Sequence, residues 1–392
     1  MTQGKPGITR EIAIISLAIF FADASHSTVI PIFPGFAQEI GASLSMLGSY
    51  GSIAALTMLI FSLPLGRLSD KHGRKRMMLP GLALFILVPL SYLLASSPLH
   101  LYPIRMLLGL AVGMIFSNGF LLMTETAEPG FRNTAQGMYM TSMGIGFTLG
   151  PLIGGFTAKL YGSHISFLIS AAFGALSLLL FSVVPEKHRQ TIDKAPREKI
   201  TITSIIKDRK VLAAGVANFL NSLMFNALTL FFPVYGASIG FDESQIGTSF
   251  TSRGLASTVV RLPVGALTKH IRALFLMISG LILSSLMIFG VSQSTLLTYV
   301  SILMGIQGIA YGIYLTSGNV YVAQNSEEDY RGTAMAVFSM FGNLSGIINP
   351  LILGLIAENL GSRGALVFSS AVTLIGVVLV YYLASKSESK SP

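Results

Sequence analysis

The chain of 392 residues has no cysteine, and only 11% of its residues are charged. Without cysteine, disulfides, thiolate metal sites and cysteine nucleophiles are excluded. Soluble globular proteins carry roughly 25% charged residues. The smaller share in this chain cannot cover a water-exposed surface. Hydrophobic residues instead make up 52% of the chain. They form runs of about 20 residues, long enough to cross a ~30 Å hydrocarbon core. We therefore expect an all-α membrane protein with many spans.

Helices are the expected form of these runs, because lipid cannot satisfy open backbone groups and barrel strands are much shorter. The first run carries Asp23 and His26 and has no small-residue cleavage site, so we expect a retained helix and not a signal peptide. The sequence predicts twelve transmembrane helices, near residues 11–36, 45–65, 76–96, 100–124, 133–158, 163–184, 210–236, 244–266, 273–292, 296–322, 333–358 and 363–384.

Lysine and arginine are distributed unequally between the two sides of the predicted membrane. Loops on the side away from the N-terminus hold only Lys159 and Arg363. The positive-inside rule therefore predicts that both termini and the long linker lie in the cytoplasm. We expect the membrane to be the cytoplasmic (plasma) membrane. The net charge is +9. The positive residues cluster between apolar runs, as membrane topology requires, so we expect no nucleic-acid partner. Outside the long polar stretch before residue 210, the basic residues on the cytoplasmic side are Arg67, Lys71, Arg74, Lys75, Arg76, Arg132, Lys269, Arg272 and Arg331.

The two halves of the chain match each other at an offset of 199 residues. The register indicates an N-terminal six-helix bundle (1–184), a cytoplasmic linker (185–209) and a C-terminal six-helix bundle (210–392). Two bundles of the same orientation are typical of transporters that bind their substrate near the midplane. The matches include Pro34 with Pro233, Gly41 with Gly240, Ser45 with Ser244, Gly48 with Gly247, Pro64 with Pro263, Arg132 with Arg331, Pro151 with Pro350 and Gly155 with Gly354.

After the second span, residues 66–76 read GRLSDKHGRKR. This segment resembles the loop 2–3 motif of the major facilitator superfamily, in which the cluster latches the two halves on the cytoplasmic side. Its glycines permit a tight turn and a close helix contact, and an arginine here can pair with an acid at the inner end of the fourth span. The predicted latch comprises Gly66, Asp70, Gly73, Arg74 and Glu125.

The fifth span reads GFTLGPLIGG at residues 146–155. Glycines at every fourth position predict one smooth groove for a neighbouring helix, and the proline allows a bend. The glycine–proline pair followed by two glycines resembles the motif of drug:proton antiporters in the same superfamily, although plain helix packing without antiport is the alternative. The motif residues are Gly146, Gly150, Pro151, Gly154 and Gly155.

The fourth span carries Arg105 four residues before Gly109, similar to the superfamily motif in which the arginine is implicated in proton transfer. The family often has glutamine where this chain has Leu108. The first span, with Asp23 and Pro31, is similar to that of twelve-span drug exporters. Together the resemblances imply the major facilitator fold, with two pseudo-symmetric six-helix bundles, and secondary active transport.

Charged residues inside the spans are costly and therefore indicate function. Asp23, Arg105 and Arg253 are predicted at similar depth, and His26 is one helical turn from Asp23. We expect Asp23 to be the main proton-binding group, because desolvation favours its neutral form and a nearby arginine favours the carboxylate. His26 is either a proton relay or a hydrogen-bonded partner. Arg253 contacts substrate, neutralises Asp23 or holds a helix in place.

Several neutral polar side chains lie on single stripes of the seventh and tenth spans. They line a cavity or serve as polar contacts between helices, and both interpretations stay open. These residues are Asn218, Asn221, Gln307, Tyr311 and Tyr314.

The predicted function is secondary active transport by alternating access, with export of amphipathic or drug-like molecules in exchange for protons. The first alternative is a proton-coupled carrier of organic anions or lipid-like substrates, and the remote one is a non-transporting membrane sensor. No Walker loop, His-Glu-x-x-His motif or other catalytic or metal site is present in the sequence, so we expect no enzyme and no cofactor. The expected partners are a small-molecule substrate, protons and the bilayer, and we expect a monomer.

Overall fold

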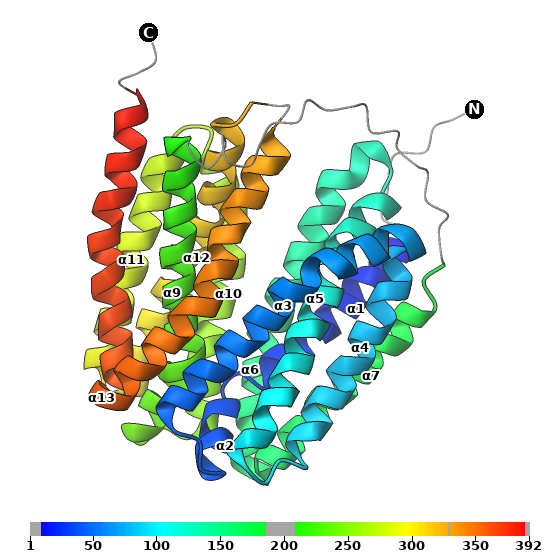
Figure 1. Ribbon diagram of the computed structural model, residues 1–392, viewed down its shortest axis with the longest axis vertical. Helices are drawn as coiled ribbons and strands as arrows, with labels where there is room; N and C mark the ends of the chain where they lie inside the picture. The colour runs from blue at the N-terminus through cyan, green and yellow to red at the C-terminus, as the bar shows by residue number, and fades with distance from the viewer. Residues whose placement is uncertain (1–8, 186–207, 328–329, 389–392) are drawn as a thin grey trace. The chain divides into compact units, whose positions relative to one another are not determined.

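The computed structural model describes residues 9–185, 208–327 and 330–388, and within these ranges it contains helices and no strand (Figure 1). The predicted all-α class is confirmed, and each predicted span overlaps helical residues. The α-helices are α1 (Arg10–Thr28), α2 (Phe33–Glu39), α3 (Leu44–His72), α4 (Arg74–Tyr92), α5 (Leu101–Thr126), α6 (Arg132–Tyr161), α7 (Ser163–Ser182), α9 (Arg209–Ser238), α10 (Glu243–Leu267), α11 (Ala273–Gln293), α12 (Leu297–Gln324) and α13 (Arg331–Glu388).

Among the described residues, nine helical segments are long and apolar enough to cross a membrane. One of them is α13, which Gly361 divides into two arms because its φ of 74° is not helical. The glycine-rich α6 and the serine- and threonine-rich α10 are not among the nine. Their polar and small residues reduce hydropathy, and both helices carry residues that the sequence marked as functional.

The first predicted span is not one continuous helix, which corrects the predicted range of 11–36. Helix α1 ends at Thr28 and α2 begins at Phe33, with a turn between them. Pro31 lies in that turn, and proline both lacks an N–H donor and disfavours helical backbone at the residue before it. The break places Phe33 at the start of a separate short helix.

Turn glycines mark the helix ends and repeat the internal offset. Gly41 and Gly240 have φ of 95° and 89°, and Gly162 and Gly361 have φ of 85° and 74°. The members of each pair are 199 residues apart, and glycine adopts this left-handed backbone without steric cost. The fifth glycine of this kind, Gly73 with φ 96°, forms the tight turn that the sequence predicted between α3 and α4.

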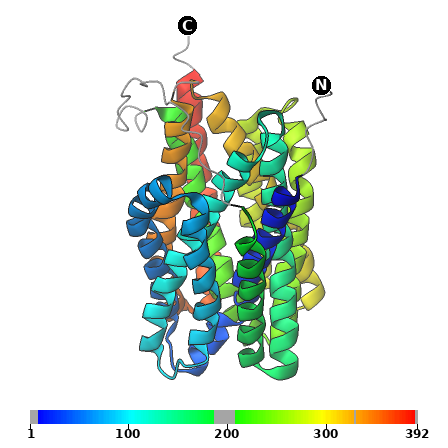
Figure 2. The ribbon, with the colours of Figure 1, turned by 90° about the vertical axis from the view of Figure 1, so that its right-hand side faces the viewer.

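The chain forms two compact units, which are 1–42, 53–190 and 240–251 for the first and 43–52, 191–239 and 252–392 for the second. Helices α3 and α10 therefore divide between the units. In the first unit α1 packs against α6 and α7, and α4 packs against α5 and α7 (Figure 2). In the second unit α9 packs against α13, and α11 packs against α12 and α13. The predicted linker, 185–209, lies outside the described residues except at its two ends.

Candidate functional site

Asp23 lies on α1, is 5% exposed and faces the glycine-rich side of α6. A Cβ built on Gly146 would lie 2.9 Å from the Cβ of Asp23 and 2.8 Å from the carbonyl oxygen of Phe20. Ser27, one turn further along α1, donates a hydrogen bond of 3.0 Å to the carbonyl oxygen of Gly146. The acidic side chain is therefore held at a direct backbone contact between two helices.

The same contact continues along α6 and confirms the predicted groove. A Cβ on Gly150 would collide with the hydroxyl of Ser27, and a Cβ on Gly154 would collide with the carbonyl oxygen of Thr28. Gly155 faces elsewhere, because its Cβ would collide with the carbonyl oxygen of Glu243 at the start of α10. The α6 backbone at Gly146, Gly150 and Gly154 thus packs against α1, whereas Gly155 contacts the start of α10.

His26 lies one turn beyond Asp23 on α1 but has a different neighbour. Its ring stacks on Phe85 of α4, with centroids 6.0 Å apart and planes 11° apart. Asp23 instead acts electrostatically on Tyr139 of α6, whose hydroxyl donates to the carbonyl oxygen of Phe116 at 2.8 Å. The two side chains therefore border on different helices, and the relay role of His26 stays a prediction.

Arg105 of α5 lies over the ring of Phe33, with its guanidinium carbon 3.3 Å from the ring centroid. Such cation–π contacts contribute about 0.5–2 kcal/mol. The charge of Arg105 also acts on His26 and Tyr92. Phe33 reaches this position because the turn after α1 starts a new helix, so the sequence analysis, which predicted one continuous span, did not anticipate the contact.

Arg253 of α10 is 2% exposed and lies in a polar and aromatic cluster of the second unit. Its Nε donates to Oε1 of Gln307 at 2.6 Å, and Nε2 of Gln307 donates to Oγ of Ser284 at 2.9 Å. The guanidinium carbon is 4.8 Å from the ring centroid of Tyr311 and 5.3 Å from that of Phe225. Four neutral side chains from three helices, α9, α11 and α12, therefore surround and orient one buried cation.

The predicted cavity residues do not all have the same surroundings. Asn218 donates to the carbonyl oxygen of Phe338 at 2.8 Å, and the hydroxyl of Tyr314 donates to Oδ1 of Asn218 at 3.3 Å. Gln307 likewise joins helices, so these three residues make polar contacts between helices. Tyr311 is half-buried and stacks on Phe225 with centroids 6.2 Å apart. Asn221 is 7% exposed.

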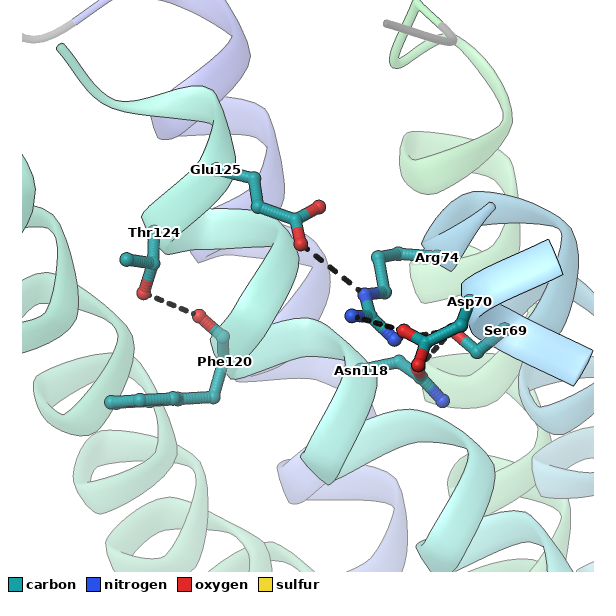
Figure 3. A network of polar contacts seen from close by, with 7 residues as sticks. All are labelled: Ser69, Asp70, Arg74, Asn118, Phe120, Thr124 and Glu125. Atoms are coloured by element: carbon teal, nitrogen blue, oxygen red, sulfur yellow. Dashed lines mark hydrogen bonds and ion pairs between the residues drawn. The ribbon is translucent and has the colours of Figure 1, made fainter. Parts of the chain in front are cut away.

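The predicted cytoplasmic latch forms an ion-pair cluster inside the first unit (Figure 3). Arg74 lies between Asp70, with Nη2 to Oδ1 at 2.8 Å, and Glu125 on α5, with Nε to Oε1 at 3.4 Å. Its Nη1 also donates to Ser69 at 3.0 Å, which in turn donates to Asn118 at 2.5 Å. The predicted pairing of the arginine with Glu125 is therefore observed.

Gly66 departs from the expectation for the same motif. A Cβ built on it would meet no described atom within 4 Å, so the predicted close helix contact at this glycine is wrong. The residue lies on the stretch of α3 whose side chains are mostly exposed. The turn at Gly73, and not a contact at Gly66, is what brings Asp70 and Arg74 together.

The sequence model of the Major Facilitator Superfamily matches residues 15–241 and again 214–392, which together span most of the chain. The chain belongs to the major facilitator superfamily. It is similar to Multidrug resistance protein 1 of Bacillus subtilis (strain 168), with 25% identity over 381 residues that cover 96% of each chain. It is also similar to Multidrug resistance protein MdtG of Escherichia coli O17:K52:H18, with 24% identity over 380 residues that cover 94% of this chain and 93% of the relative.

Solved structures show the same fold. A bacterial homolog of the human lysosomal transporter Spinster, in an inward-facing and occupied conformation, superposes with a TM-score of 0.80 at 14% identity, covering 96% of both chains. The human organic anion transporter MFSD10 superposes with a TM-score of 0.66 at 18% identity, covering 95% of this chain and all of the other. The protein is thus a transporter of the major facilitator superfamily with several membrane-spanning helices.

One feature of this major facilitator protein was present in the repeat but not used in the sequence analysis. Gly109 lies against the carbonyl oxygen of Ala54, and 199 residues later Gly308 lies against the carbonyl oxygen of Arg253. The glutamine that the family motif places before the first glycine is absent at Leu108 but present at Gln307. The offset of 199 thus relates the contact of Gly109 with Ala54 to that of Gly308 with Arg253, and the residue before Gly308 is the partner of Arg253. Among the described residues, no group of three or more His, Asp or Glu could hold a metal ion.

Proposed function

We propose that this transporter exports amphipathic or drug-like molecules in exchange for protons, with Asp23 as the main proton-binding group. The observation that carries the proposal is the contact between α1 and α6, in which the antiporter-type glycines lie directly against the helix that holds the buried Asp23. The names of the multidrug resistance relatives support the substrate class. In this proposal the membrane is the plasma membrane, and both termini lie in the cytoplasm because Lys and Arg concentrate on the side of the termini.

The chemistry follows from where the carboxyl group lies. An ionised carboxylate in a membrane interior is stable only with a cation, hydrogen-bond donors or water beside it. The side chain of Asp23 lies directly against the α6 backbone at Gly146. Any motion between α1 and α6 therefore changes the surroundings of Asp23. Helix movement during the transport cycle therefore changes whether the proton is held or released, which couples proton flux to substrate flux.

The test is Asp23→Asn in proteoliposomes with an imposed pH gradient. The variant should fold and bind substrate, yet lose at least about 90% of gradient-driven flux, since an amide cannot exchange a proton at neutral pH. Glu39→Gln is the matched control, because Glu39 is an exposed acid at the end of α2, and its flux should equal that of the wild type. Proton-coupled flux at the wild-type rate in Asp23→Asn would remove Asp23 from the mechanism.

A second candidate function, transport of organic anions, is favoured by the cluster around Arg253. The guanidinium is held in one orientation by neutral side chains, which are Gln307, Ser284, Tyr311 and Phe225. An oriented arginine is suited to bind a carboxylate or phosphate through two hydrogen bonds, and the half-buried rings of Phe225 and Tyr311 offer flat apolar surfaces beside it.

Gln307→Glu tests this candidate, because it places a carboxylate on the Nε of Arg253 with almost no change in shape. If the arginine binds anionic substrates, flux of an anionic amphiphile should fall at least about tenfold relative to a neutral analogue, the factor that corresponds to 1.4 kcal/mol. Gln324→Glu, on the exposed end of the same helix, should leave that ratio unchanged. An unchanged ratio in Gln307→Glu would exclude the anion reading and leave drug:proton exchange as the function.

A further inference from the structure

An apolar groove lies on the second unit, where the last turn of α11 meets the start of the second arm of α13. It has a volume of about 520 Å³ and is lined by Phe289, Leu360, Val367 and Phe368, with Gln293 and Arg363 as its polar residues. Phe289 and Leu360 expose 46% and 69% of their surface. We name this feature the α11–α13 groove, and its size is in the range of small-molecule sites, about 300–1,000 Å³.

The polar and apolar ends of the groove are separated along the helices. Gln293 is the last residue of α11, and Arg363 follows the kink at Gly361 by two residues. Phe368 lies five residues further along α13, roughly 7.5 Å deeper at 1.5 Å per residue. The groove is therefore charged where the membrane helices end and apolar toward their middle, which is the polarity of a phospholipid.

The guanidinium of Arg363 is held in place at the polar end. Its Nη2 donates to Oε1 of Gln293, and Nε2 of Gln293 donates to Oγ of Ser292 at 2.9 Å. Arg363 is exposed, and a guanidinium has five N–H donors in a planar fork that matches phosphate oxygens. The chain thus presents an oriented cation beside an apolar trough.

Lysine and arginine are scarce on this side of the protein, where the acids Glu39, Asp242, Glu243 and Glu358 also lie, which makes Arg363 stand out. The only other lysine or arginine in the loops predicted on this side is Lys159, and its Nζ pairs with Oδ2 of Asp242 at 2.9 Å. The positive charge beside the groove therefore has a distinct place on a side that is otherwise poor in cations.

We propose that the α11–α13 groove binds one phospholipid with a net negative headgroup, from the leaflet on the side away from the termini. The phosphate contacts Arg363, and an acyl chain lies along Phe289, Val367 and Phe368. Charge complementarity selects this occupant. A neutral detergent fills the apolar trough but gains nothing from the guanidinium, and a zwitterionic phospholipid offers the same phosphate together with a headgroup cation that Arg363 repels. The bound lipid joins α11 to the arm of α13 that begins at the Gly361 kink.

The absence of tryptophan from the chain makes a direct test possible, because a single introduced tryptophan is the only indole reporter. Phe289→Trp places it in the groove. The protein is reconstituted in vesicles of phosphatidylcholine that contain brominated phosphatidylglycerol or, in parallel, brominated phosphatidylcholine, and bromine quenches an indole that it contacts. We expect brominated phosphatidylglycerol to associate about fivefold more strongly, the factor that one basic residue near a membrane surface provides.

Two further variants in the Phe289→Trp background locate the source of the preference. Arg363→Gln should reduce the fivefold preference to about one, and Arg363→Lys should keep most of it because the charge remains. Phe275→Trp is the matched reporter control, since Phe275 is 64% exposed and lies at the opposite end of α11. Whatever preference Phe275→Trp shows, Arg363→Gln should not change it.

Equal quenching by the two brominated lipids in Phe289→Trp would overturn the proposal, as would a preference that persists in Arg363→Gln. If Arg363→Gln fails to fold, competition decides the question in the Phe289→Trp protein alone. Unlabelled phosphatidylglycerol should then relieve quenching by the brominated form about five times more effectively than unlabelled phosphatidylcholine does. Equal competition would refute an anion-selective site.

Discussion

Two helix crossings at equivalent positions of the internal repeat, one in each unit, share the same backbone contact. In the first unit Gly247 of α10 lies against the carbonyl oxygen of Pro151 in α6. In the second unit Gly48 of α3 lies against the carbonyl oxygen of Pro350 in α13. The two prolines and the two glycines are each 199 residues apart. At both crossings a Cβ on the glycine would collide with that oxygen, so both require a residue without a side chain.

The charges beside the two crossings differ. In the first, Lys159 at the end of α6 pairs with Asp242, which precedes α10 and forms a reciprocal capping box with Gln245 through bonds of 3.0 Å in each direction. In the second, position 358 holds a glutamate in place of the lysine, and its Oε2 accepts the backbone N–H of Ser45 in the first turn of α3 at 2.9 Å. The charged residue is therefore a cation on α6 at the first crossing and an anion on α13 at the second.

The difference shows which parts of the repeat are constrained. A contact between one backbone and another has no freedom to adjust, because protein interiors are close-packed, and so the same glycine and proline occur in both halves. The helix ends have water or headgroups beside them and tolerate any pair that satisfies the first-turn N–H groups. An acid as a cap and an acid from a neighbouring helix are two ways to do so.

The largest effect is expected at the glycines. Gly247→Ala and Gly48→Ala each force a methyl group onto a backbone carbonyl, and overpacking of this kind costs about 1–3 kcal/mol. Both variants should lower the midpoint of thermal unfolding in detergent by similar amounts. Gly265→Ala and Gly66→Ala are the controls, because these glycines lie on the same two helices and a Cβ on either would meet no described atom within 4 Å. A wild-type midpoint in one crossing variant only would show that the two crossings are not equivalent in energy.

A smaller, pH-dependent effect should distinguish the crossings by charge. Burial would raise the pKa of Asp242, but hydrogen bonds from Ser244, Lys159 and the Gln245 backbone, together with the charge of Lys159, outweigh burial and lower that pKa. The pair therefore stabilises the fold fully above the ordinary aspartate pKa of about 3.9, and the stabilisation is lost as the pH falls through the lower, folded-state pKa.

We expect Asp242→Asn to reduce stability by about 0.5–1 kcal/mol near neutral pH, the size of an exposed ion pair, and to match the wild type once the pH is below the folded-state pKa. Thermal unfolding from pH 3 to pH 8 measures the difference. Glu358→Gln should have a smaller effect at neutral pH, because an amide oxygen still accepts the N–H of Ser45. A larger loss in Glu358→Gln than in Asp242→Asn would reverse the proposed order of the two crossings.

Much of the fold follows from local sequence features. The apolar runs give the spans, because only hydrogen-bonded helices satisfy the backbone in lipid. The spacing of Gly146, Gly150 and Gly154 predicted a helix contact that the structure shows against α1. The pairing of Arg74 with Glu125 also follows from the motif and the span ends. Each of these depends on periodicity or on a motif within one or two helices.

Other features depend on which helices meet, and hydropathy carries no such information. The break after Thr28, which places Phe33 against Arg105, is a local turn hidden inside an apolar run. The open space at Gly66 shows that a motif glycine does not by itself specify a neighbour. Arg253 was recognised as a charge inside a span, yet its partner Gln307 is 54 residues away on another helix.

The order of amino acids thus determines that the chain crosses a membrane in helices, that it repeats after 199 residues and that a few charges lie within its spans. These properties follow from transfer free energies and from backbone conformations, which are set residue by residue. Which helix each glycine contacts, and which neutral side chains orient Arg253 and Arg363, was decided by tertiary packing. Such contacts join residues distant in the chain, and their geometry depends on how whole helices approach each other in three dimensions.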